Sequence, residues 1–167
     1  MPAITSVLND HMPGADENQL LAAIELARQA RTNGNHPFGA LLVDGDGRVV
    51  LEAENTVVTG MDSTAHAEMN VIRAVGERDP EFLRRCTLYA STEPCAMCAA
   101  ALYWRGVRRV VFALSSEGLR RITGSDPASP HLAISCREVF AHANHEVEVS
   151  GPQLEEQARA VHEGFWG

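Results

Sequence analysis

Two short motifs in the sequence carry side chains that suit metal chemistry. The segment His66-Ala67-Glu68 supplies an imidazole and a carboxylate, and Pro94-Cys95-Ala96-Met97-Cys98 supplies two thiols. Cys95 and Cys98 are three residues apart, so on a helix they share a face and can both reach one ion. Zinc binds thiolate and imidazole well, and three protein ligands leave its fourth tetrahedral position open. The sequence therefore predicts a catalytic zinc site with His66, Cys95 and Cys98 as ligands.

The carboxylate of Glu68 suits a different task. Glu68 lies two residues from His66, and residues at that spacing do not share a helix face. We therefore expect Glu68 to reach the substrate side of the metal without binding it. There it would take a proton from a zinc-activated water and pass it to a ring nitrogen and then to a departing amine. The expected reaction replaces an amine by oxygen on a ring carbon and releases ammonia.

A structural zinc site is the alternative, and it would need a fourth protein ligand. Cys86 precedes an apolar strand and Cys136 lies among apolar residues, so both indicate core positions. The other histidines have no paired spacing that suggests a metal, and His142-Ala143-Asn144-His145 is the best of a weak set. This alternative predicts a non-enzymatic zinc-stabilised module in which Glu68→Gln leaves every function intact.

The elements that must position these side chains follow from apolar spacing and turn residues. The pattern predicts helices over 16–34, 64–76, 91–106 and 152–162, strands over 38–43, 48–53, 87–90, 109–113 and 147–149, and a short helix or mixed segment over 132–140. Asp16 and Gln19 predict a capping box, and Pro94 is expected in the first turn of its helix. The stretch 115–130 predicts a long loop. Strands that alternate with helices predict an α/β fold.

The composition limits the class of partner. The chain has 167 residues with 22 acidic residues, 14 Arg and no Lys, which gives a net charge of −8. An acidic chain is a poor general binder of phosphate backbones, although Arg84-Arg85, Arg105 with Arg108-Arg109, and Arg120-Arg121 form short basic clusters. The four Cys are too few for a disulfide scaffold, and no apolar stretch reaches the roughly 18 residues that cross a membrane. We expect a single domain over 1–167 in a soluble cytoplasmic protein.

From about Pro37 to Ala113 the chain resembles the cytidine-deaminase-like superfamily, and within it bacterial guanine deaminases and tRNA adenosine deaminases. The signature H-x-E…P-C-x-x-C is the centre of this likeness. The matching residues are Pro37-Phe38-Gly39-Ala40, Asn55, Thr64-Ala65-His66-Ala67-Glu68, Leu88-Tyr89, Glu93-Pro94-Cys95-Ala96-Met97-Cys98 and Tyr103-Trp104. The resemblance implies a three-layer α/β/α sandwich around a five-stranded mixed sheet, zinc as cofactor, Glu68 as proton shuttle and a homodimer.

The resemblance also implies where a base would bind. Asn55 would hydrogen-bond the purine, and Phe38 with nearby apolar groups would wall the pocket. The tail Phe165-Trp166 resembles the C-terminal segment that covers the site in small-base deaminases. Guanine deaminases carry an acidic residue after a Gly-Phe pair, and Gly124-Ser125-Asp126 is the nearest equivalent, without the Phe. The expected substrate contacts are Phe38, Asn55, Ala67, Trp104, Asp126 and Trp166.

The first functional hypothesis is a zinc-dependent hydrolytic deaminase of a free nucleobase or nucleoside, with guanine to xanthine as the first reaction to test. The segments Pro37-Phe38-Gly39 and Tyr103-Trp104, together with the acidic charge, favour it. A tRNA-specific adenosine deaminase is one alternative, and it predicts salt-sensitive tRNA binding through the Arg clusters. A cytosine- or triazine-type small-base deaminase is the other. The first hypothesis expects neither a nucleic acid nor a membrane as partner.

Overall fold

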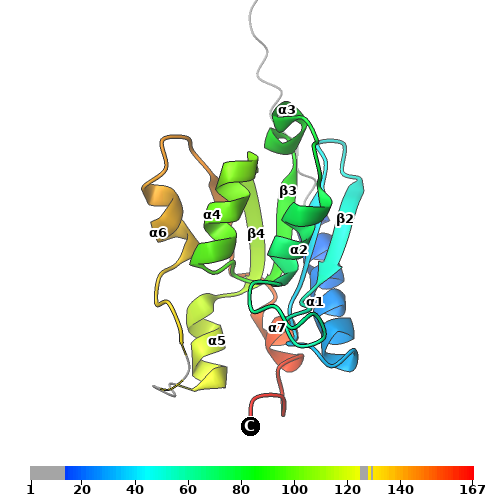
Figure 1. The fold of residues 1–167 in the computed structure, drawn as a ribbon, viewed down its shortest axis with the longest axis vertical. Helices are drawn as coiled ribbons and strands as arrows, with labels where there is room; N and C mark the ends of the chain where they lie inside the picture. Colours follow the sequence, from blue (N-terminus) through cyan, green and yellow to red (C-terminus); the bar gives the residue numbers. More distant parts are fainter. Residues whose placement is uncertain (1–13, 125–127, 129) are drawn as a thin grey trace, which may run out of the picture.

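A mixed five-stranded sheet forms the centre of the protein (Figure 1), as expected. The computed structural model describes residues 14–124, 128 and 130–167. The strands are β1 (Gly39–Val43), β2 (Val49–Glu54), β3 (Thr87–Thr92), β4 (Arg109–Leu114) and β5 (Glu148–Ser150), in the order β2-β1-β3-β4-β5. β1 pairs antiparallel with β2 and β3, whereas β3, β4 and β5 are parallel.

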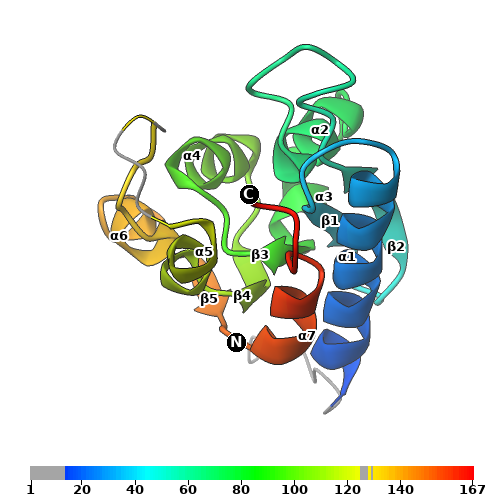
Figure 2. The same ribbon diagram turned by 90° about the horizontal axis from the view of Figure 1, so that it is seen from below.

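Helices cover both faces of the sheet, which confirms the three-layer arrangement (Figure 2). The helices are α1 (Ala15–Thr32), α2 (Ala67–Ala74), α3 (Pro80–Arg84), α4 (Ala96–Arg105), α5 (Ser116–Thr123), α6 (Cys136–Ala141) and α7 (Glu155–Ala160). Side chains alternate across each strand, so Leu42 and Leu88 pack with α2, α4 and α6, while Leu41 and Tyr89 pack with α1 and α7. No helix in the described part of the chain is long and apolar enough to cross a membrane.

One edge of the sheet collects the segments that carry the two motifs. β2 ends opposite the start of β1, where Glu54 pairs with Gly39, and β3 and β4 end side by side, where Thr92 pairs with Leu114. The chain leaves β2 and β3 at this edge to begin α2 and α4, and the residues that precede these helices as N-caps are His66 and Cys95. The fold therefore brings the two motifs to the same end of the molecule, at the lower end of Figure 1.

The predicted capping box at the first helix is wrong. The N-cap of α1 is Gly14, with no side-chain cap, and Asp16 lies inside the first turn. The Asp16 carboxylate instead accepts hydrogen bonds from Arg109, at 2.8 Å, and from the Tyr89 hydroxyl, at 2.6 Å. A long-range ion pair with β4 therefore uses the side chain that the local pattern assigned to a cap.

The segment 115–130 is also different from the predicted loop, because it contains α5. The Ser115 side chain caps this helix by accepting a hydrogen bond from the Gly118 amide at 3.0 Å. The buried Glu93 carboxylate accepts another from the Ser116 amide at 2.8 Å. Pro94 likewise precedes the N-cap Cys95 instead of opening α4. Short α3 was not predicted, and the C-terminal helix is shorter than expected.

Candidate active site

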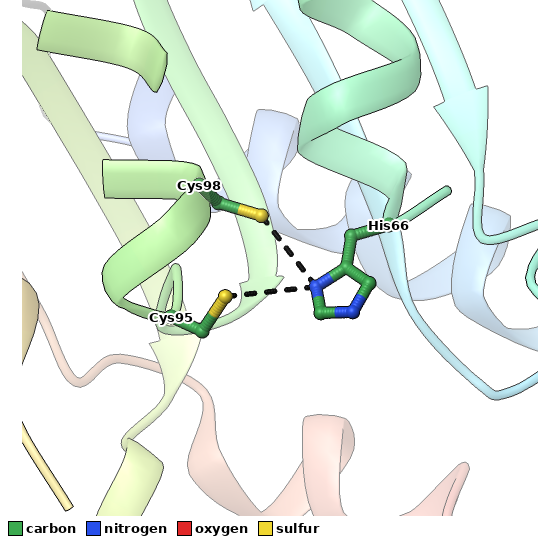
Figure 3. A group of neighbouring side chains, drawn as sticks. All are labelled: His66, Cys95 and Cys98. Atoms are coloured by element: carbon green, nitrogen blue, oxygen red, sulfur yellow. Dashed lines mark hydrogen bonds between the residues drawn. The ribbon is translucent and has the colours of Figure 1, made fainter. Parts of the chain in front are cut away.

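The three predicted metal ligands converge between α2 and α4 (Figure 3). His66 Nδ1 lies 3.6 Å from Cys95 Sγ and 3.5 Å from Cys98 Sγ. Tetrahedral zinc, with Zn–S of about 2.3 Å and Zn–N of about 2.0–2.1 Å, places sulfur and nitrogen ligands about 3.5–3.6 Å apart. The donor set and its spacing therefore fit zinc. These side chains form the one group of at least three possible ligands in the described ranges, and their ligand atoms lie within 4.8 Å of one another.

The three side chains differ in pKa, because hydrogen bonds and burial act on each of them differently. A hydrogen bond from Cys98, followed by one from His66, lowers the pKa of Cys95 to about 4. The same hydrogen bond, together with burial, raises the pKa of Cys98, and the hydrogen bond to Cys95 raises the pKa of His66. Cys95 is therefore a thiolate in the free site, whereas Cys98 must lose a proton before it can bind a metal.

Glu68 lies beside the ligand group without belonging to it. It occupies the first turn of α2, its residue is only 7% exposed, and the Cys98 thiol is close enough for each group to shift the pKa of the other. Burial, followed by the nearby Cys95 thiolate, raises the pKa of Glu68 to about 7. A carboxyl group with such a pKa can both accept and donate a proton near neutral pH.

The two residues expected to touch a base occupy the same edge of the sheet. The Asn55 amide donates to the Phe38 carbonyl at 3.0 Å, and the Asn55 side-chain oxygen accepts from the Val57 amide at 3.0 Å. The residue Asn55 is 1% exposed, and within the described residues its side chain takes part in hydrogen bonding through the oxygen, which leaves the Nδ2 group available to a ligand. Ala67, also an expected contact, is buried at the start of α2. This edge therefore offers an amide donor beside an apolar wall.

The C-terminal tail, residues 161–166, lies over this edge. In Figure 2 it crosses in front of the end of β3, between α4 and α2. The Trp166 ring lies 5.5 Å from the His36 ring and 6.2 Å from the Phe38 ring, measured between centroids. Trp166 is thus placed against the residue expected to wall the pocket.

Arg31, near the end of α1, holds the tail in this position. Its guanidinium donates to the Val161 carbonyl at 2.9 Å and to the Glu163 carbonyl at 2.7 Å. It also lies over the Phe165 ring, 5.5 Å from the centroid. One side chain therefore links α1 to three residues of the tail.

The remaining expected residues lie elsewhere. Trp104 is 82% exposed in the last turn of α4, where its ring contacts Tyr103, so it does not join the site within one chain. Asp126 lies outside the described residues. Cys86 and Cys136 are buried in the core, as expected, and belong to no ligand group in the described ranges.

Sequence reasoning did not single out Arg31 or His162 as residues of this region. A basic residue in the last turn of a helix is expected for the helix dipole alone. An isolated His in a terminal helix has no partner at metal-ligand spacing. In the structure, however, His162 is buried against the Phe38 ring, with 5.4 Å between centroids.

Comparison with known proteins places the chain in a family. Residues 13–114 match the cytidine and deoxycytidylate deaminase zinc-binding region. A protein of Schizosaccharomyces pombe named probable cytosine deaminase is 45% identical over 149 residues, which cover 88% of this chain and 90% of that protein.

Two solved structures are also similar. A tRNA:A34 deaminase has a TM-score of 0.67 and 31% identity, over 87% of this chain and 99% of that one. Guanine deaminase from Bacillus subtilis has a TM-score of 0.59 and 30% identity, over 78% and 96% of the two chains. The zinc-binding region of the family spans His66, Glu68, Cys95 and Cys98. The chain therefore belongs to the cytidine and deoxycytidylate deaminase family, with zinc as its cofactor.

Proposed function

We propose that the protein is a hydrolytic deaminase of a free nucleobase or nucleoside. The observation that carries this proposal is the position of Glu68, buried beside the three ligands yet outside the ligand group. A structural zinc site has four protein ligands and no use for such a carboxylate. The aromatic tail over the same edge favours a small substrate enclosed by protein.

The chemistry follows from this arrangement. Zinc held by His66, Cys95 and Cys98 would act as a Lewis acid that lowers the pKa of a water molecule. Glu68 accepts a proton from that water and delivers it to a ring nitrogen of the base. The water oxygen bonds to the amine-bearing carbon. Glu68 then takes the second proton from this oxygen and passes it to the amine, the C–N bond breaks, and the oxygen becomes a carbonyl. Base and water are thereby converted to an oxo base and ammonia.

The side chains around the ligand group would hold the base. Asn55 Nδ2 donates no hydrogen bond to the protein in the described ranges, so it can bond to an acceptor of the base. Phe38, half-buried just before β1, supplies apolar surface, and Ala67 at the start of α2 is the buried residue between the ligand His66 and Glu68. Trp166 would close the pocket from the tail, since its ring already lies 6.2 Å from that of Phe38.

Guanine and cytosine are the two main candidate substrates. The sequence motifs predicted guanine, and Bacillus subtilis guanine deaminase shares the fold at 30% identity. Cytosine is favoured by the Schizosaccharomyces pombe relative, which is 45% identical over 88% of this chain. Because that relative matches beyond the shared zinc-binding region, cytosine is tested beside guanine.

A tRNA substrate is less well supported. Arg84 and Arg105 end α3 and α4, so they lie at the end of the molecule opposite the N-cap Cys95 (Figure 1). Phosphate contacts fix how a nucleic acid is placed on a protein, so basic clusters beside the site where the base reacts would favour a tRNA substrate. Two of the three Arg clusters do not meet this condition.

The test is an ammonia-release screen with the zinc-loaded protein against cytosine, guanine, adenine, their nucleosides, a triazine and a tRNA anticodon stem-loop. We expect ammonia from at least one free base or nucleoside, and none when Glu68→Gln replaces the wild-type protein. Release from the stem-loop alone would establish the tRNA alternative. No ammonia from any compound would overturn the proposal.

Removal of the Arg31 side chain is expected to loosen the tail. Arg31→Ala deletes two charge-assisted hydrogen bonds to tail carbonyls, and such bonds contribute about 1.5–3 kcal/mol each. We expect kcat/KM to fall about 10- to 100-fold and amide exchange in residues 161–166 to accelerate. Arg31→Lys keeps the positive charge but not the planar guanidinium that donates to both carbonyls, so its fall in kcat/KM should be intermediate.

Arg28 provides the matched control, because it lies one turn earlier on α1 and pairs only with exposed Glu25 among the interactions of the described chain. Arg28→Ala should leave both kcat/KM and the exchange of the tail unchanged. Wild-type exchange in Arg31→Ala would show that the tail does not depend on this residue.

We also propose that residues 1–167 act as one deaminase domain and that two copies form a homodimer. All described helices pack around one sheet, which supports the single domain. Trp104, which is 82% exposed on α4 and lies against the half-buried Tyr103, gives an aromatic surface that a second copy would cover. Light scattering should give twice the chain mass of 18.1 kDa, and Trp104→Ser should shift it toward a single chain.

A further inference from the structure

His162 holds a buried hydrogen-bond donor that the protein itself does not use. The side chain is 1% exposed, and its Nδ1 accepts a hydrogen bond from the Trp166 indole at 3.0 Å. Burial, with the nearby Arg31 charge, lowers the pKa of His162 to about 4, so the ring is neutral near pH 7. With Nδ1 acting as acceptor, the single ring proton lies on Nε2. This Nε2 group has no hydrogen-bond partner within the described ranges.

The ring of His162 lies next to the substrate side of the molecule. Its closest aromatic neighbours are Phe38, at 5.4 Å in an edge contact, and Trp166, at 6.2 Å and nearly parallel. Phe38 in turn is fixed at the edge of the sheet, since its carbonyl accepts from the Asn55 amide at 3.0 Å. Because the two ring nitrogens point in diverging directions, the bond to Trp166 turns Nε2 away from the end of the tail.

A second unpartnered polar atom marks the same edge. Within the described part of the chain, the buried side-chain atoms without a hydrogen-bond partner are His162 Nε2 and Thr92 Oγ1. Thr92 ends β3, three residues before the ligand Cys95. Buried polar groups in native proteins almost always have partners, and an exception requires an explanation such as a bound molecule. Of these two atoms, His162 Nε2 belongs to a ring that contacts Phe38, the residue proposed to wall the base site.

We propose that His162 Nε2 donates a hydrogen bond to an acceptor atom of the bound base, a carbonyl oxygen or an unprotonated ring nitrogen, and thereby helps to determine which bases are bound. The inference rests on the proposed function, because the ligand is the base that is deaminated. His162 is then a specificity-determining residue: a base that presents an amine or a C–H group at this position leaves the donor unpaired and is rejected.

Replacement of His162 should affect stability and base binding differently if the residue binds the base than if it only fills the core. A buried His that only fills the core loses stability when it is replaced. An unpartnered buried donor is unfavourable in the free protein, so its removal should offset the loss of the hydrogen bond from the Trp166 indole to Nδ1, and stability should not fall while base binding weakens. Phe suits the substitution, because it keeps an aromatic ring beside Phe38 and removes the donor.

The experiment measures binding of cytosine and guanine to zinc-loaded full-length protein that carries Glu68→Gln, so that bound base is not consumed. In this background we expect His162→Phe to raise the Kd of the bound base about 10- to 100-fold with an unchanged or higher Tm. His162→Gln, which can still donate, should lie between the two. His142→Phe, at the exposed end of α6, is the control and should bind as the unsubstituted site does.

An NMR measurement on protein that keeps His162 tests the same contact without any substitution at this position. In ¹⁵N-labelled protein, the His162 Nε2–H resonance should be visible and should move downfield when the site is saturated with base. An unmoved resonance with base bound, or wild-type affinity in His162→Phe, would overturn the contact. A shifted resonance without ammonia from wild-type protein would retain the contact and overturn the proposed function. No binding of either base would overturn both.

Discussion

Glu68→Gln should lower kcat by about 10² to 10⁴, the usual contribution of a general acid–base group, and leave one zinc ion bound per chain. The carboxylate of Glu68 is buried beside Cys98 but is not one of the converging ligands. Gln has nearly the same shape and can keep the neighbouring contact, yet its amide cannot take up a proton from water. The loss should therefore appear in kcat, while KM and metal content change little.

A matched control is available at Glu81, which occupies the first turn of α3 as Glu68 occupies the first turn of α2. Glu81 is exposed and pairs with Arg84. Glu81→Gln changes the same functional group in the same helical position, so it should retain wild-type kcat. The measurement is steady-state ammonia release, with zinc quantified on the same samples. A Glu68→Gln protein that keeps more than about a tenth of the wild-type kcat would exclude the proton-shuttle role.

The predictable part of this protein is the part that short-range patterns determine. The turn at 44–47 with apolar runs on both sides predicted the hairpin of β1 and β2, which the structure confirms. Helical spacing likewise predicted α2 and α4, and the i, i+3 spacing of Cys95 and Cys98 predicted that both reach one point. Each of these inferences depends on residues close together in the chain, where backbone geometry leaves few alternatives.

Long-range contacts explain what the patterns did not predict. Asp16 had the local setting of a cap, but an ion pair with Arg109, far along the chain, uses its carboxylate. The stretch that contains α5 lacks apolar periodicity, and Glu93 stabilises its start from another element. The burial of His162 and the role of Arg31 depend on contacts between the tail and α1. These contacts join residues far apart in the sequence, so a short sequence pattern does not predict them.

The position of Trp104 could have been anticipated. It lies six residues after Cys98 on α4, and six residues turn a helix by about 600° and advance it by about 9 Å. The Trp104 side chain must then point about 120° away from that of Cys98 around the helix axis, and it lies nearly two turns farther along the helix. The resemblance assigned Trp104 to the pocket, but this arithmetic places it on another face, where the structure has it 82% exposed.

Cys98→Ser is expected to remove zinc and with it almost all activity. A serine hydroxyl is a poor zinc ligand beside one thiolate and one imidazole, so the variant should be isolated with well under one zinc per chain. Because a Lewis-acid metal supplies several kcal/mol of transition-state stabilisation, the rate should fall by at least about 10³. Chelation of wild-type zinc should reproduce this loss, and added zinc should reverse it. Both can be measured by ammonia release beside metal analysis.

Stability should respond to the same change, because zinc binds to the folded protein through side chains of two separate helices. A ligand that binds only the native state raises the free energy of unfolding, so metal removal should lower Tm. Cys86→Ala separates this effect from the loss of a buried thiol: Cys86 is 1% exposed in the core and lies outside the ligand group. It should lose stability through the cavity it leaves yet keep one zinc and the wild-type kcat. If Cys98→Ser matched Cys86→Ala in zinc content and in kcat, then His66, Cys95 and Cys98 would not be the zinc ligands, because only Cys98 belongs to the converging group.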